Sequence, residues 1–348
     1  MRKWVIAVTV MMLMPWMVSL MWMRAAGMEA EAAAEAGQAG GQEESGTEEK
    51  TEEVEAAAGV RQENGGSEED RREGQEQGTV RRKILVERKG VQTFIDLEDY
   101  LPGVMVCQID ADYEMEALKC QAVIARTYIY RLMDGRTEIY EEELDMDYLG
   151  EGEGYSGIDR VKLLGWLERC QEAADATKGV VMQYEGRCIL PLFHAMSAGR
   201  TRMGEVDFPY LQPAESVSDT RREDYMQVQE WSRSVFAANI SQIPGAAAVT
   251  AEQLPQQIQT VKKDDAGYIT KMKIGEGTYS GDEIQYALGL SSSCFSLEGE
   301  GDIIRARVRG RGHGYGLSQA GADDMAKSGW GYEDILNHYY KNISLISE

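Results

Sequence analysis

Apolar residues at alternating spacings of three and four predict a long amphipathic helix over residues 113–133. Its apolar stripe consists of Met115, Leu118, Ala122, Ala125, Ile129 and Leu132. Asp112 is the expected N-cap, Glu114 and Glu116 stand in the first turn, and Gly135 follows the last turn. The two alanines in the stripe indicate close packing of this helix against another element.

Shorter patterns predict the other elements. Residues 158–176 are typical of a second helix, with apolar positions at 161, 164, 166 and 167. Residues 179–184 and 188–194 predict two strands joined at 185–187, and two further strands are predicted at 268–274 and 303–308. Residues 322–328 and 332–340 predict two terminal helices. Because helices and strands do not alternate regularly, the pattern favours an α+β fold over a doubly wound sheet.

The N-terminus contains a run of uncharged, mostly apolar residues at 4–23, behind Arg2 and Lys3. Its length matches one membrane span, and the basic flank favours a cytoplasmic N-terminus. A cleaved signal peptide is the alternative, because small residues follow at 25–27. We expect residues 1–27 to be a transmembrane anchor or signal, with the C-terminal part of the chain outside the cytoplasm in a single-pass arrangement.

Residues 28–80 are predicted to be an acidic, disordered linker. They contain sixteen acidic and four basic residues, and almost no branched apolar or aromatic side chain. Such a segment buries too little apolar surface to offset the entropy lost on ordering. Repulsion between its carboxylates favours an extended tether.

Residues 81–348 have the length of one large domain or of two smaller lobes. The first 27 residues carry +3 and the linker −12, so −14 of the total −23 lies in this region. That charge argues against nucleic acid as a partner and is compatible with a neutral glycan. No cofactor is expected. The five cysteines are odd in number and leave pairing undetermined: Cys107, Cys120, Cys170, Cys188 and Cys294.

Three segments carry unusual polar and small residues. The first is LEDYLPGV at 97–104 with ALKCQAVIARTY at 117–128, the second is FHAMSAGRT at 193–201, and the third is GHGYGLSQAGA at 312–322. The third is dense in glycine, at Gly312, Gly314, Gly316 and Gly321, which frees the backbone for close approach. A tight connection between strands is the simpler explanation for a single such loop.

Together the three segments resemble the SpoIID/LytB family of stage II sporulation D proteins and amidase enhancers, over about residues 83–346. The resemblance implies a membrane-anchored domain that interacts with peptidoglycan glycan strands in sporulation, engulfment or wall remodelling. It also implies partners: a wall hydrolase or amidase, and other membrane-anchored wall-remodelling proteins.

Members of the family that cut glycan are similar to lytic transglycosylases, in which one glutamic acid performs both proton transfers. In the family motif this glutamate stands eight residues before the glutamate matched here by Glu116, and that position is Gln108. An amide is not a usable acid or base. Either the domain binds glycan without cutting it, or a nearby carboxylate such as Asp110 or Asp112 acts instead. An ectodomain without glycan contact would leave the polar segments unexplained.

The resemblance implies a groove that binds the glycan strand, with Lys119 and Arg126 near it. These two residues are seven positions apart and so share one helix face. A solvated face is the simpler explanation for them. The other candidates are His194, Ser197, Thr201, His313, Ser318 and Gln319. No metal is expected, because residues 196–207 lack the cysteines that some family members use for zinc. A serine–histidine hydrolase is disfavoured, since no Gly-x-Ser-x-Gly sequence occurs. His338 is predicted to be a packing or surface residue.

Overall fold

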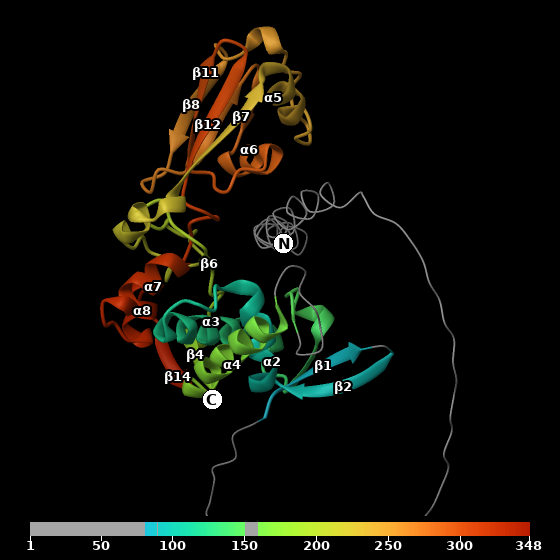
Figure 1. Cartoon of the computed structure of the whole chain (residues 1–348), viewed down its shortest axis with the longest axis vertical. Helices are drawn as coiled ribbons and strands as arrows, with labels where there is room; N and C mark the ends of the chain where they lie inside the picture. The colour runs from blue at the N-terminus through green and yellow to red at the C-terminus, as the bar shows by residue number, and fades with distance from the viewer. Residues whose placement is uncertain (1–80, 89, 150–158) are drawn as a thin grey trace, which may run out of the picture. The chain divides into compact units, whose positions relative to one another are not determined.

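The computed structural model describes residues 81–88, 90–149 and 159–348, and this part has a mixed α+β fold (Figure 1). The α+β class is therefore confirmed for these residues. The predicted anchor and acidic linker lie outside the described residues. Among the helices of the described part, none is both long enough and apolar enough to cross a membrane.

Helix α3 (Met115–Met133) is the central element of the helical part (Figure 1). It packs against α2 (Leu97–Gln108) and α4 (Arg160–Ala176), and also against α7 (Gln319–Lys327) and α8 (Tyr332–Tyr339). The predicted stripe faces the first pair of helices, within one core. A second set of apolar residues faces α7 and α8: Ala117, Cys120, Val123 and Ile124. The helix is thus buried on two sides, which explains its many small residues.

The predicted start of α3 was wrong by two residues, and Asp112 is not its cap. The N-cap is Glu114, whose side chain makes no capping hydrogen bond. The preceding residues form a loop held by Arg169 of α4, which donates to the carbonyls of Ala111 (2.8 Å) and Tyr113 (2.7 Å). These two bonds keep the loop out of the helix.

The buried face of α4 also differs from the prediction. Leu163, Leu167 and Cys170 are buried, whereas Val161 is 76% exposed and Leu164 is partly exposed. The apolar residues of this helix are spread around it, so their spacing alone selects no single face.

Two small sheets flank the helices. In the first, β1 (Lys83–Arg88) pairs antiparallel with β2 (Val91–Asp96) and parallel with β3 (Glu138–Tyr140). In the second, β4 (Val180–Tyr184) lies between β5 (Arg187–Cys188) and β14 (Ser344–Ser347). The short 3₁₀ turn η1 (Glu141–Glu143) follows β3.

The predicted strand at 188–194 is split between two sheets. Its first residue belongs to β5, while β6 (Phe193–His194) pairs in parallel with β13 (Leu317–Ser318). Pro191 lies between them and has no N–H to contribute to a ladder, which accounts for the break.

A further hydrophobic core lies where two three-stranded sheets meet two short helices (Figure 1). One sheet has the order β11 (Phe295–Glu300), β12 (Ile303–Arg309), β7 (Met226–Ser232), and the other β10 (Gly277–Tyr279), β9 (Ile269–Ile274), β8 (Ile258–Lys263). The helices are α5 (Arg233–Ile240) and α6 (Gly281–Leu288). The predicted strands at 268–274 and 303–308 are confirmed. Three 3₁₀ turns complete the chain: η2 (Val217–Arg221), η3 (Glu223–Tyr225) and η4 (Ala251–Gln253).

Candidate functional site

The three unusual sequence segments meet where β6 pairs with β13. In this parallel pair, Phe193 lies beside Leu317 and His194 beside Ser318, so the second segment adjoins the third. Ser318 is the N-cap of α7, its Oγ accepting from the N–H of Gly321 at 3.2 Å. This cap starts α7 three residues earlier than predicted and places Gln319 in its first turn.

Three glutamines connect the third segment to the first. Gln121 of α3 donates from Nε2 to Oε1 of Gln108 at 2.7 Å. Gln319 donates from Nε2 to the Gln108 carbonyl (2.7 Å) and to Oε1 of Gln121 (3.1 Å). Gln108 is half-buried at the end of α2, whereas Gln121 is fully buried. The position that the family resemblance assigns to the acid therefore belongs to a network of amides.

Sequence reasoning missed Gln121, although it lies within the ALKCQAV stretch. Its polar side chain interrupts the apolar side of α3 that faces α7 and α8, and that interruption was the available signal. A buried amide at such a position requires hydrogen-bond partners, and Gln108 and Gln319 provide them.

Two histidines from the second and third segments lie together, with ring centroids 5.7 Å apart. Nδ1 of His194 lies 3.1 Å from the Tyr315 carbonyl; because a carbonyl only accepts, Nδ1 carries the proton and donates. Nδ1 of His313 accepts from the Tyr315 N–H at 3.0 Å and so carries none. Nε2 of His194 is buried with no hydrogen-bond partner among the described residues.

Both histidines are neutral at physiological pH. Burial, and then repulsion from His313 once that ring is protonated in acid, lower the pKa of His194 to about 3. Burial, and then the Arg202 guanidinium, lower the pKa of His313 to about 4. Neutral imidazoles can donate and accept hydrogen bonds, but at neutral pH they are poor proton donors.

Asp219 of η2 is a central residue that sequence reasoning did not find. Its Oδ2 accepts from the N–H (2.8 Å) and Oγ (2.6 Å) of Ser197 and from Oγ of Ser318 (2.7 Å). All three residues are fully buried. Burial raises the pKa of Asp219, while its serine hydrogen bonds oppose that shift. This carboxyl group ties the second segment to the third, and no motif marks it in the sequence.

Several predicted groove residues are committed to internal contacts. Ser197 and Ser318 bind Asp219, and Oγ1 of the buried Thr201 accepts from the Ala214 N–H at 2.8 Å. These three hydroxyl groups therefore hold neighbouring segments of the chain together. None of them lines an open surface.

Lys119 and Arg126 also do not share a solvated face. Arg126 is fully buried, and its guanidinium pairs with both carboxylate oxygens of Glu98, at 2.8 and 2.6 Å. Lys119 is partly exposed and forms an ion pair with Glu116 at 2.6 Å. The 3.6-residue period places them on one side of α3, but α2 and α4 cover that side at Arg126. The Arg126 side chain is therefore closed off from solvent.

The glycine-rich loop depends on its glycines for two reasons. Gly312, Gly314 and Gly316 all have positive φ, and a Cβ on Gly316 would collide with the Leu192 carbonyl. Gly321 lies inside α7, where a Cβ would collide with the hydroxyl groups of Ser216 and Tyr339. The loop and α7 thus pass closely over β6 and α8.

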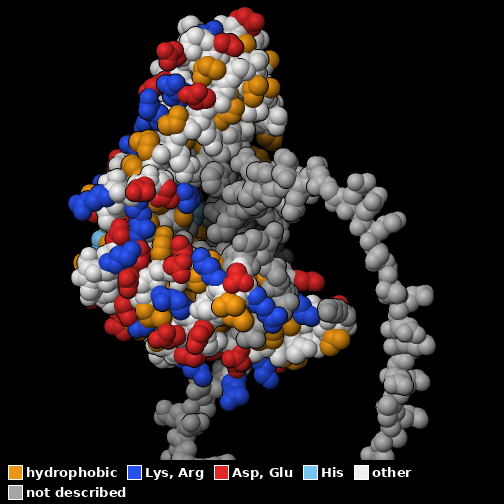
Figure 2. Space-filling view, in the orientation of Figure 1, with side chains coloured by type: hydrophobic (Ala, Val, Ile, Leu, Met, Phe, Trp, Pro, Cys, Tyr) orange, Lys and Arg blue, Asp and Glu red, His pale blue; other side chains and the backbone are white. Residues whose placement is uncertain are grey.

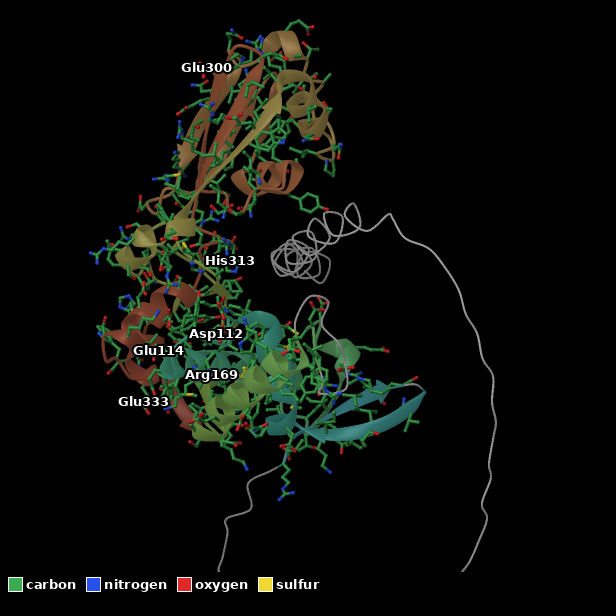
Figure 3. All side chains as sticks on the ribbon, in the orientation of Figure 1. Asp112, Glu114, Arg169, Glu300, His313 and Glu333 are labelled. Carbon is green, nitrogen blue, oxygen red and sulfur yellow. The ribbon has the colours of Figure 1, made fainter. Side chains whose placement is uncertain are left out.

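The alternative acids lie on the loop between α2 and α3, which packs against α4 beside Arg169 (Figure 3). Asp110 is exposed and accepts the Asp112 N–H at 3.0 Å. Asp112 is exposed and accepts the indole N–H of Trp166 at 3.0 Å. Neither carboxyl is desolvated as a general acid near neutral pH usually is.

Neither a metal-binding cluster nor a surface patch of one charge marks this site in the described part of the chain. Within the described residues, no group of three or more histidine, cysteine or acidic side chains could hold a metal ion, and none of the five cysteines there forms a disulfide. On the face drawn in Figure 2, acidic and basic side chains are interspersed and are not separated by sign.

Comparison with known proteins matches the stage II sporulation protein (SpoIID) family model to residues 87–184. Stage II sporulation protein D of Bacillus subtilis is 30% identical over 267 residues, covering 72% of this chain and 74% of that protein. The protein of the same name from Bacillus amyloliquefaciens is 28% identical with the same coverage. An uncharacterized protein of Brachyspira hyodysenteriae is 27% identical over 261 residues, covering 72% of this chain and 67% of that protein. The chain therefore belongs to the stage II sporulation protein D family.

Proposed function

We propose that this chain binds peptidoglycan glycan strands at the site around Gln108, without cutting them, as part of a sporulation-related process. Family membership and the names of its relatives support the sporulation-related role. The proposal includes a membrane anchor that holds the domain outside the cytoplasm. It also includes a wall hydrolase or amidase, or other membrane-anchored wall-remodelling proteins, as partners.

The observation that carries the proposal is the amide at position 108. Cleavage by a single acid requires a carboxyl group that loses and regains a proton, and the Gln108 amide does neither. Its Oε1 accepts from Gln121, and its Nε2 hydrogens have no acceptor among the described residues. Those hydrogens can therefore donate to a sugar oxygen.

The alternative is an active lytic transglycosylase with a relocated acid. Asp110 and Asp112 lie within four residues of Gln108, on a loop made rigid by Arg169. Their exposure argues against this alternative, as does the contact between Asp112 and Trp166.

The test is digestion of purified glycan strands by the full chain, with mass spectrometry of anhydro-sugar ends and a parallel pull-down. We expect the wild type to bind strands and to release few anhydro ends. Gln108→Glu should raise cleavage at least about 10²-fold, because it restores an acid in nearly the same volume. Gln121 would bind one carboxylate oxygen and leave the other to carry the proton.

Four further variants complete this test. His313→Ala should weaken binding and keep the fold. Strong wild-type cleavage that survives Gln108→Ala and disappears in Asp110→Asn or Asp112→Asn would establish the alternative. A wild type that neither binds nor cuts would contradict both.

A further inference from the structure

The turn between α7 and α8 presents an exposed aromatic ring beside polar side chains. Trp330 is 42% exposed, although it is large and apolar. It borders a shallow hollow of about 440 Å³ whose other lining residues are Gly329, Asp334, Asn337 and His338. None of these residues takes part in the Gln108 site.

The turn that carries Trp330 is rigid. Gly329 has φ +89° and donates to the Ala326 carbonyl at 2.9 Å, and Trp330 donates to the Met325 carbonyl at 3.1 Å. This pair of bonds is a Schellman motif closing α7. Two residues later, the N–H of Tyr332 donates to Glu116 of α3 at 2.8 Å. These hydrogen bonds hold the backbone of the turn against the core of the domain.

A packed histidine fixes the indole from one side. The ring of His338 meets Trp330 nearly at a right angle, with centroids 5.9 Å apart. Nε2 of His338 lies 2.8 Å from the Glu215 carbonyl and therefore donates to it. Nδ1 of the neutral ring remains an acceptor. Burial is the main cause of the lowered pKa of His338, so the neutral ring prevails at physiological pH.

The polar groups around the hollow are mostly acceptors. Asp334, Asn337 and His338 are three and four residues apart on α8, so they share one face of the helix. Asn337 donates from Nδ2 to the Glu333 carbonyl at 2.9 Å, which leaves its Oδ1 free to accept. The Asp334 carboxylate has no cationic partner within the described part of the chain. The indole N–H of Trp330 also has no acceptor there.

We propose that this hollow, the Trp330 site, binds a single pyranose ring of a neutral sugar. The apolar C–H face of a pyranose stacks on an aromatic ring, and its hydroxyl groups donate to carboxylate and amide oxygens. Asp334 and the adjacent Glu333, which is labelled on α8 in Figure 3, disfavour an anionic ligand. The choice of an N-acetylhexosamine rests on the proposed function, since that is the sugar class of peptidoglycan strands.

A basic peptide is the competing ligand, because a cation also binds over an indole beside a carboxylate. The single aromatic face and the acceptors spread along α8 favour the sugar. A pyranose chair carries several hydroxyl groups that can contact Asp334 and Asn337 together, whereas one ammonium group is compact.

The test is calorimetric titration of the full chain with the N-acetylglucosamine trimer. Trp330→Ala should weaken binding about tenfold or more, and Trp330→Phe should weaken it less, since a smaller ring remains. Asp334→Asn should weaken it only a few-fold, because the amide keeps one acceptor. The matched control is Trp231→Phe, since Trp231 packs against Phe236 in a separate core. It should bind the trimer like the wild type.

Other outcomes separate this inference from the proposed function. Unchanged trimer affinity in Trp330→Ala would overturn it, as would displacement of the trimer by oligolysine at equal concentration. Trimer binding that disappears in Gln108→Ala and persists in Trp330→Ala would also overturn it, leaving the Gln108 site intact. Trimer binding that depends on Trp330, in a chain that fails to retain whole glycan strands, would uphold the Trp330 site and contradict the proposed function.

Discussion

At the scale of single residues, burial sets the charge of the groups that connect the three segments. It lowers the pKa of His194 and His313 and raises that of Asp219. The lowered pKa of the histidines and the raised pKa of Asp219 have opposite effects on how stability changes with pH. The histidines stabilise the fold only while neutral, so their contribution is present above their unfolded pKa of about 6.5 and is lost as the pH falls. Asp219 stabilises more when protonated, so its contribution is lost as the pH rises through its raised pKa.

We predict that the free energy of unfolding falls as the pH decreases from about 7 to about 4. Each histidine should contribute a loss on the order of 3 kcal/mol by pH 4, given folded pKa values of about 3 and about 4. Urea denaturation across this range measures the loss. His313→Asn keeps an acceptor for the Tyr315 N–H and removes one titrating group, so its profile should be flatter. Identical pH profiles for the two proteins would contradict the assignment of His313.

At the scale of elements, close packing explains why glycine occurs inside helices. In α7, Gly321 is where the helix meets Ser216 and Tyr339, beside Asp219. In α4, Gly165 has no atom within 4 Å of an added Cβ. An added Cβ would therefore collide with neighbours at Gly321 in α7 but would meet open space at Gly165 in α4.

We predict that Gly321→Ala destabilises the domain and that the matched control Gly165→Ala stabilises it. The first substitution overpacks the contact between α7 and α8, which should cost about 1–3 kcal/mol. The second lowers the entropy of the unfolded chain without a clash and should contribute about 0.5–1 kcal/mol. Thermal and urea midpoints measure both. Equal shifts of the same sign would show that propensity, and not packing, governs these positions.

At the scale of the whole molecule, the charge of the chain is uneven along the sequence. About half of the net −23 lies in residues 28–80, while the described residues mix both signs on the face shown in Figure 2. The described residues pack into apolar cores built from segments far apart in the chain. The composition of residues 28–80 predicts no comparable core.

We predict that the full chain partitions with membranes and that limited proteolysis releases a stable fragment beginning near residue 80. The uncharged run at 4–23 and the acidic linker motivate this expectation. Mass spectrometry of the fragment gives its N-terminus. A linker cleaved as slowly as the folded domain would refute the prediction, and so would full recovery of the uncleaved chain in the soluble fraction.

The sequence by itself determined the family, the α+β class and the helices α3, α4, α7 and α8, but not α2, α5 or α6. Helix α3 was predictable because its apolar spacing follows the helical period over five turns. The glycine-rich loop was predictable as a site of close approach, since glycine has no Cβ.

Only the tertiary structure decided which polar residues are available to a ligand. Arg126, Ser197 and Ser318 look like groove residues in the sequence, but long-range partners bury them. Asp219 and Gln121 gain their importance from contacts across 22 and 198 residues of sequence, with Ser197 and Gln319 respectively. Periodicity reports which side of an element a residue occupies. What covers that side depends on how distant segments pack, and local sequence does not encode it.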